Sequence, residues 1–176
     1  MKKIYTTNHK TPVGELILGQ IGDSLCLCDW SYRKMRGSID KRIKTHFAAD
    51  FISSQTDFLQ NCKAQIDEYF AKERETFDIN LKVAGTNFQE SVWNMLCNIN
   101  YGNTVSYIEL SKIIGDEKAI RAVASANGAN AISIIIPCHR VIGSNGQLTG
   151  YAGGLKAKEY LLNLEGSLDK TQLKLF

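Results

Sequence analysis

The chain has 176 residues, of which 44% are hydrophobic and 22% charged, and its formal net charge is +3. These values suit one domain, or two small domains that share an interface. They exclude a membrane-spanning protein, because no run approaches the roughly 18 uninterrupted apolar residues that a span requires. The small net charge neither requires nor excludes a nucleic-acid partner.

Cysteine usage indicates the redox environment. Five cysteines are present, an odd number, and the residues from Met1 to His9 contain no apolar core of the kind found in secretory signals. We therefore expect a cytoplasmic protein whose thiols are reduced and free.

The first half of the chain favours a small α+β unit. Alternating apolar residues and turn residues predict strands over 4–7, 15–21, 25–30, 47–53 and 77–83. Asp57 begins an amphipathic helix. The break at Ala84 and Gly85 ends a first domain, residues 1–85, which carries no catalytic pattern and which we expect to support the second.

Two patterns in this half have both a functional and a structural interpretation. Cys26 and Cys28 alternate onto one strand face and suggest a metal site completed by His9, His46 or Cys62. We favour core packing and predict no metal, because Cys-x-Cys is not the usual ligand spacing. The basic segment 31–46 favours a solvated helical face over a nucleic-acid patch, and its basic residues are Arg33, Lys34, Arg36, Lys41, Arg42 and Lys44.

The second half predicts a helix-turn-helix. Thr86 and Asn87 can cap a first helix, and Ser106 with Glu109 forms a capping-box pattern that opens a second helix over 107–114. Gly115 ends it, and a third helix follows over 117–127. Such a pair of short helices is typical of DNA-binding proteins, although most helical hairpins of this size are packing units.

The distribution of charge in the second half strengthens the prediction that it binds DNA. Residues 118–158 contain no Asp or Glu, and the segment is rich in glycine, which allows close approach to a partner. An acid-free surface suits phosphates, whereas the alternative is a glycine-rich loop without a partner. The cations of this segment are Lys118, Arg121, Arg140, Lys156 and Lys158.

A thiol lies in a rigid corner of this half. The β-branched run 134–136 predicts a buried strand that Pro137 ends, so Cys138 is held in place beside His139. A nucleophilic cysteine needs a base or a positive environment, while an inert cysteine only fills space. A closing helix over 155–164 ends at Glu165, a carboxylate that opposes the helix dipole and for which a histidine partner would account.

These residues resemble a known family. Ile136-Pro-Cys-His-Arg-Val141, preceded by Asn130 and by Arg121-Ala-Val, is similar to the O6-alkylguanine-DNA alkyltransferases, the methylated-DNA–protein-cysteine methyltransferases. The likeness runs from about Phe88 to Gly166. It implies an α+β fold with a ribonuclease H-like α/β domain at 1–85 and a mostly helical domain at 86–176 that carries a winged helix-turn-helix-like motif.

The resemblance implies DNA repair by direct reversal. Cys138 would take the alkyl group irreversibly, in one stoichiometric event, from O6-alkylguanine in a base flipped out of the duplex. His139 would accept the thiol proton through a water molecule, and Glu165 would orient His139. Asn130 would tie the recognition helix to the active-site strand, and Tyr107 would protonate or hydrogen-bond guanine N3.

The same resemblance implies how DNA is held. Arg121 would fill the space that the flipped base leaves. Double-stranded DNA containing O6-alkylguanine would be the partner of a monomer that needs no cofactor, no metal and no membrane; whether O4-methylthymine is also a substrate stays open. The implied DNA contacts are Lys118, Arg121, Ala122, Ser125 and Arg140, and the implied base pocket is Tyr151, Ala152, Gly153 and Val141.

Three alternatives come from other classes. A non-catalytic protein could bind alkylated DNA and mark it for other repair, but Cys138, His139 and Glu165 argue against it. A transcriptional regulator would need a dimer surface or an effector module. A cysteine hydrolase would need turnover and an oxyanion hole.

Overall fold

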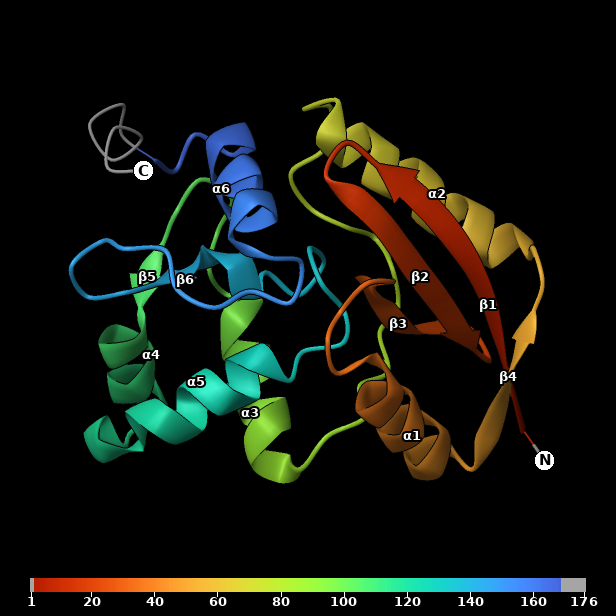
Figure 1. Ribbon diagram of the computed structural model, residues 1–176, viewed down its shortest axis with the longest axis horizontal. Coiled ribbons are helices and arrows are strands. Elements are labelled where there is room, and N and C mark those ends of the chain that lie inside the picture. Colours follow the sequence, from red (N-terminus) through yellow and green to blue (C-terminus); the bar gives the residue numbers. More distant parts are fainter. Residues whose placement is uncertain (1, 169–176) are drawn as a thin grey trace.

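The computed structural model describes residues 2–168 and consists of two halves that lie side by side (Figure 1). The first half is a four-stranded sheet in the order β3-β2-β1-β4. Its strands are β1 (Lys2–Thr11), β2 (Gly14–Ile21), β3 (Ser24–Trp30) and β4 (Ala49–Ser53). Two helices accompany them, α1 (Arg36–Phe47) and α2 (Asp57–Phe70).

The first-half sheet follows the predicted hairpins. β1 pairs antiparallel with β2, β2 antiparallel with β3, and β1 parallel with β4. All seven residues of β3 are buried, because the strand lies between the rest of the sheet and the second half. The predicted helix after Thr56 is α2, which contacts β1 and β2 and buries Leu59, Ile66 and Tyr69.

The strand predicted over 77–83 is wrong. Within it only Leu81 forms a bridge, with Leu25, through hydrogen bonds from Leu25 N to Asn80 O (2.8 Å) and from Lys82 N to Leu25 O (2.9 Å). The alternation of apolar residues therefore reflects an extended connection that packs on the core without a ladder.

The second half contains the predicted helix-turn-helix. It comprises α3 (Asn87–Leu96), β5 (Val105–Ser106), α4 (Tyr107–Ile114), a 3₁₀ turn η1 (Glu117–Ala119), α5 (Ile120–Gly128), a second 3₁₀ turn η2 (Cys138–Arg140), β6 (Val141–Ile142) and α6 (Leu155–Leu164). Capping boxes open α3 and α4, and Gly115 ends α4 with φ 93°. The predicted third helix is divided into η1 and α5. None of the helices within residues 2–168 is long and apolar enough to cross a bilayer.

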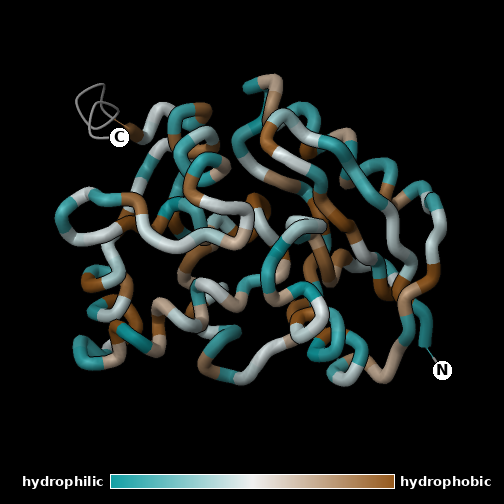
Figure 2. The backbone as a smooth tube through the Cα atoms, viewed as in Figure 1, coloured by the Kyte–Doolittle hydropathy of each residue, from teal (hydrophilic) through white to brown (hydrophobic). Residues whose placement is uncertain are grey.

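The two halves share one core. Cys28 of β3 forms a parallel bridge with Ile132, through hydrogen bonds from Cys28 N to Ala131 O (2.9 Å) and from Ser133 N to Cys28 O (2.6 Å). The largest apolar cluster contains Trp30 and Tyr69 from the first half and Trp93 and Leu161 from the second. Figure 2 accordingly shows apolar positions in both halves and where they meet.

The segment before Pro137 is not the predicted strand. Residues 133–135 form a turn in which Ile134 has φ 72°, a left-handed conformation that is unusual for a β-branched residue. Hydrogen bonds close locally, from Ile135 N to Ser133 O (2.9 Å) and from Ile136 N to Ile132 O (3.0 Å). These backbone groups are therefore not available for a ladder, and the chain enters η2 directly.

Candidate active site

Cys138 begins η2 and is 3% exposed. Burial raises the pKa of its thiol, while Asn130 and the charges of Lys158 and Arg33 act in the opposite direction. The thiol is therefore protonated at neutral pH, and a nearby base has to remove the proton before sulfur can attack.

His139 is a candidate for that base. Its Nε2 lies 2.8 Å from Oε1 of Glu165, and both side chains are fully buried. Burial lowers the pKa of His139, so the imidazole is neutral at pH 7 and Nε2–H donates to the carboxylate. Nδ1, which has no hydrogen-bond partner among residues 2–168, is then the nitrogen that can accept a proton.

Glu165 is held as an anion by several donors. Tyr69 donates to Oε1 (2.7 Å), and Arg140 donates from Nε to Oε2 (2.9 Å) and from its second terminal nitrogen to Oε1 (3.0 Å). Burial alone would raise the pKa of Glu165, but the hydrogen bonds from His139 and Arg140 lower it to about 2. The expected partnership between His139 and the carboxylate after α6 is thus present in the geometry.

Two cations predicted to face phosphates lie inside the protein instead. Arg140, an expected DNA contact, is 6% exposed and bound to Glu165. Lys158 is completely buried, and its Nζ donates to the carbonyl oxygens of Val141 (2.6 Å) and Thr149 (2.8 Å). Arg140 balances the charge of Glu165, and the charge of Lys158 acts on Cys138. Counting charges along the chain could not distinguish these buried cations from surface ones.

Asn130 ties the end of α5 to the cysteine corner. Its Nδ2 donates to Ile136 O (2.9 Å), and its Oδ1 accepts from Ile132 N (2.9 Å). Both bonds are buried, so one side chain fixes the turn that precedes Cys138.

A groove of about 950 Å³ runs between α5 and the loop before α6. Tyr107, Arg121, Tyr151, Ala152 and Gly153 line it, as the expected roles of these residues require. Burial raises the pKa of Tyr107, so its phenol keeps the proton and can donate a hydrogen bond.

The recognition helix presents its predicted residues outward, whereas Val141 is placed differently. The exposed side chains on η1 and α5 include Lys118, Arg121, Ala122 and Ser125, together with the acidic Glu117 of η1. Val141, expected to read the base edge with its backbone, is fully buried; its carbonyl oxygen accepts from Lys158, and its N–H donates to Cys138 O.

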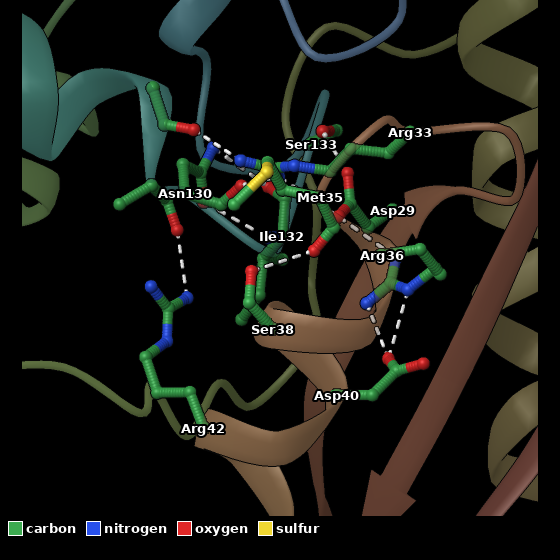
Figure 3. Close-up of polar contacts among 12 residues, drawn as sticks. Asp29, Arg33, Met35, Arg36, Ser38, Asp40, Arg42, Asn130, Ile132 and Ser133 are labelled. Atoms are coloured by element: carbon green, nitrogen blue, oxygen red, sulfur yellow. Dashed lines mark hydrogen bonds and ion pairs between the residues drawn. The ribbon is translucent and has the colours of Figure 1, made fainter.

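The basic segment 31–46 is not a simple solvated face. Arg33 and Arg36 each donate to Oδ2 of the buried Asp29 at 2.9 Å, and Arg42 donates to Ala129 O (2.7 Å) (Figure 3). Arg33 also donates to the carbonyl oxygens of Asn130 (2.8 Å) and Gly128. Arg33 and Arg42 therefore bind the end of α5, whereas Arg36 bonds Asp29 and Asp40. Lys34 and Lys41 are the exposed basic residues of the segment.

The cysteines considered for a metal site are core residues. Cys26, Cys28 and Cys62 are buried, and burial raises the pKa of each thiol, to about 12 for Cys26 and about 11 for Cys62. Within residues 2–168, no three His, Cys, Asp or Glu side chains gather as metal ligands.

The sequence did not identify Tyr69 or Lys158 as residues of the site, and Lys158 was expected only as a cation of the surface. The helical period of α2 predicts that Tyr69 is buried, and the hydroxyl group of a buried tyrosine usually has a hydrogen-bond partner. Nothing in the sequence around Tyr69 indicates that this partner is Glu165.

A helix-turn-helix beside a thiol, an imidazole and a bound carboxylate defines a DNA-binding protein that reacts through a cysteine. The family model described as the 6-O-methylguanine DNA methyltransferase DNA binding domain matches residues 87–167, and the model of the ribonuclease-like domain of the same enzymes matches residues 4–83.

Known proteins agree with these models. The methylated-DNA–protein-cysteine methyltransferase of Methanosarcina acetivorans is 44% identical over 93% of this chain and 99% of its own. The constitutive enzyme of Bacillus subtilis is 40% identical over 92% and 94%. The crystal structure of Mycobacterium tuberculosis OGT in complex with DNA matches with a TM-score of 0.79 and 40% identity, over 94% of this chain and 93% of that one.

The chain belongs to the methylated-DNA–protein-cysteine methyltransferase family. Its fold is the two-part architecture of that family, and its activity is DNA repair by direct reversal, in which an alkyl group passes from DNA to a cysteine of the protein.

Proposed function

We propose that Cys138 is the acceptor and that its substrate is O6-alkylguanine in double-stranded DNA. Support comes from Cys138 being the one cysteine next to a neutral, carboxylate-bound histidine, and from the bond that its carbonyl oxygen accepts from Asn127, a residue of the groove wall. The other four cysteines lack such a base: three are core residues, and Cys97 is exposed on the first turn after α3.

The transfer proceeds in one displacement. The Cys138 thiol gives its proton to Nδ1 of His139, directly or through one water molecule, and Sγ forms a bond to the alkyl carbon as the bond from that carbon to O6 breaks. The electron pair stays with guanine, and Tyr107 hydrogen-bonds or protonates the base at N3 as it leaves. Glu165 stabilises the imidazolium that forms.

The lesion has to leave the stack before it reaches sulfur. Cys138 lies behind the groove walls, so the alkylated nucleotide must rotate out of the duplex. Arg121, exposed on α5, would occupy the space left in the helix. Tyr151, Ala152 and Gly153 would hold the extruded base.

Alkylation of Cys138 inactivates the protein permanently. A thioether is a poor leaving group, and no group at the site can return Cys138 to a thiolate, so each molecule repairs one lesion. We also propose that the protein acts as a monomer in the cytoplasm, where its five free thiols stay reduced.

Titration of active protein against DNA with labelled O6-methylguanine tests this proposal. We expect one methyl group transferred per molecule, found on Cys138 by peptide mass mapping, and no transfer by Cys138→Ser, which should still bind DNA. Cys97→Ser is the matched control and should transfer normally. Many transfers per molecule, or a methyl group on another cysteine, would overturn the assignment; binding without any transfer would favour a non-catalytic protein.

A further inference from the structure

A short segment of the first half lines the same groove as the recognition helix. This segment, residues 31–35, joins β3 to α1. Tyr32, Arg33, Lys34 and Met35 form part of the groove wall, together with Arg121 of α5. A stretch of the ribonuclease-like half therefore lines the groove that the proposed function assigns to the extruded base.

Charge on this wall suits a phosphate. The residues that line the groove include Arg33, Lys34 and Arg121 but no carboxylate. Arg33 is already engaged by Asp29, whereas Lys34 is exposed and forms no ion pair within the described part of the chain. Lys34 is thus a cation of the wall that is available to an anionic partner.

The segment is also fixed in position. Arg33 binds the carbonyl oxygens at the end of α5, and the Tyr32 hydroxyl donates to Gly153 O (3.1 Å) on the opposite side of the groove (Figure 3 for the Arg33 contacts). Because the segment is already fixed by these contacts, little conformational entropy is lost when a partner binds to it. Met35 projects from it and is 62% exposed.

We propose that residues 31–35 are a second DNA-contacting element, in which Lys34 binds a backbone phosphate of the duplex beside the extruded nucleotide. The inference rests on DNA binding through α5, because the segment continues that surface across the groove. Lys34 adds one cation to the phosphate contacts, and Met35 packs against the sugar-phosphate backbone.

The salt dependence of binding tests this proposal. Replacing Lys34 with Gln should reduce the slope of log affinity against log salt by about 1, the effect of losing one phosphate contact on duplex DNA. Lys3→Gln is the matched control, because Lys3 is an exposed lysine on β1 beside β4, at the far edge of the sheet, and should leave the slope unchanged. An unchanged slope in Lys34→Gln, or an equal loss in both variants, would overturn the proposal.

A second measurement places the segment directly. A photoreactive benzoyl-phenylalanine at position 35 should cross-link to duplex DNA with O6-methylguanine, and the same group at position 3 should not. Cross-linking to a second protein molecule in place of DNA would show a protein interface and overturn the proposal. Methyl transfer by the unmodified protein, measured beside both experiments, separates failure of this inference from failure of the Cys138 assignment.

Discussion

The imidazole of His139 is suited to the proposed role of base because its Nε2 is already bound to Glu165. Burial lowers its pKa, which keeps the ring neutral, and Glu165 fixes the tautomer by accepting from Nε2. A neutral ring with a free Nδ1 can take the Cys138 proton, and the carboxylate then stabilises the resulting cation. Arg140 and Tyr69 prevent Glu165 from taking up the proton itself, since they hold it as an anion.

Replacing Glu165 with Gln should slow methyl transfer by about 100-fold, the usual size of a general-base contribution. The neutral amide stabilises the His139 cation less, whereas the DNA-facing helix is unchanged, so affinity for DNA should stay within about twofold. Single-turnover kinetics at saturating DNA provide the measurement. Glu159→Gln, a substitution on the same helix α6, is the control; an equal fall in both variants would contradict the role of Glu165.

Acid should destabilise the protein through the same carboxylate. The pKa of Glu165 is about 2 in the folded state against 4.5 ordinarily, so its contribution is complete above pH 4.5 and is lost as the pH falls towards 2. Linkage converts this difference into about 3 kcal/mol. Chemical denaturation at pH 6 and pH 3 should therefore show a smaller loss of unfolding free energy in Glu165→Gln than in the wild type. Parallel losses would contradict the low pKa.

At the scale of elements, side chains from the first half of the protein bind the C-terminus of α5. The carbonyl groups at the C-terminus of a helix carry partial negative charge and lack partners within the helix. Here Arg33 and Arg42 bind the carbonyl oxygens of Gly128, Ala129 and Asn130. Arg33 is in turn paired with the buried Asp29, so the first half positions α5, the helix proposed to contact DNA.

Replacing Arg33 with Met should lower the free energy of unfolding by about 2 kcal/mol, because it removes one of the two cations on the buried Asp29 and the donor to two carbonyl oxygens at the end of α5. Lys34→Met changes an exposed lysine in the same segment and should cost less than about 0.5 kcal/mol. Urea denaturation followed by circular dichroism compares the two variants. Equal stability would mean that Asp29 finds sufficient compensation from Arg36 alone.

Local signals predicted the elements whose chemistry is local. The capping residues Thr86 and Ser106 and the terminator Gly115 lie where the sequence places them, since each acts within one helical turn. The prediction of a strand at 134–136 is wrong because β-branched composition does not show that the Asn130 side chain bonds the backbone of this run. That side chain satisfies the backbone groups on both sides of the turn, so a ladder is unnecessary.

Across the whole molecule, contacts between the halves escaped prediction. The first domain was expected only to support the second, yet Tyr69 donates to Glu165 and Arg33 binds the end of α5. One motif and the carboxylate after the last helix were enough to predict Cys138, His139 and Glu165 as a group, and the structure places His139 in contact with Glu165. The two residues joined by each of the bonds Tyr69–Glu165 and Arg33–Asn130 lie 96 and 97 positions apart along the chain, and no periodicity links such distant residues.

The shared core predicts that the two halves unfold together. Trp30 and Trp93 belong to one apolar cluster, and the bridge between Cys28 and Ile132 continues the sheet of the first half into the second. Neither half can unfold completely without exposing this core, so amides on both sides of the boundary should have the same free energy of opening. Native-state hydrogen exchange in rising denaturant measures this directly.

We expect amides of β3 and amides of α3 and α5 to reach the same opening free energy, equal to that of global unfolding, while amides of the exposed edge strand β4 exchange through smaller openings. The wild-type protein is sufficient for this comparison, and no substitution disturbs the core. If β3 stays protected after α3 and α5 have exchanged, the halves are separate cooperative units, and the contacts of Tyr69 and Arg33 would have to be formed by domains that fold independently.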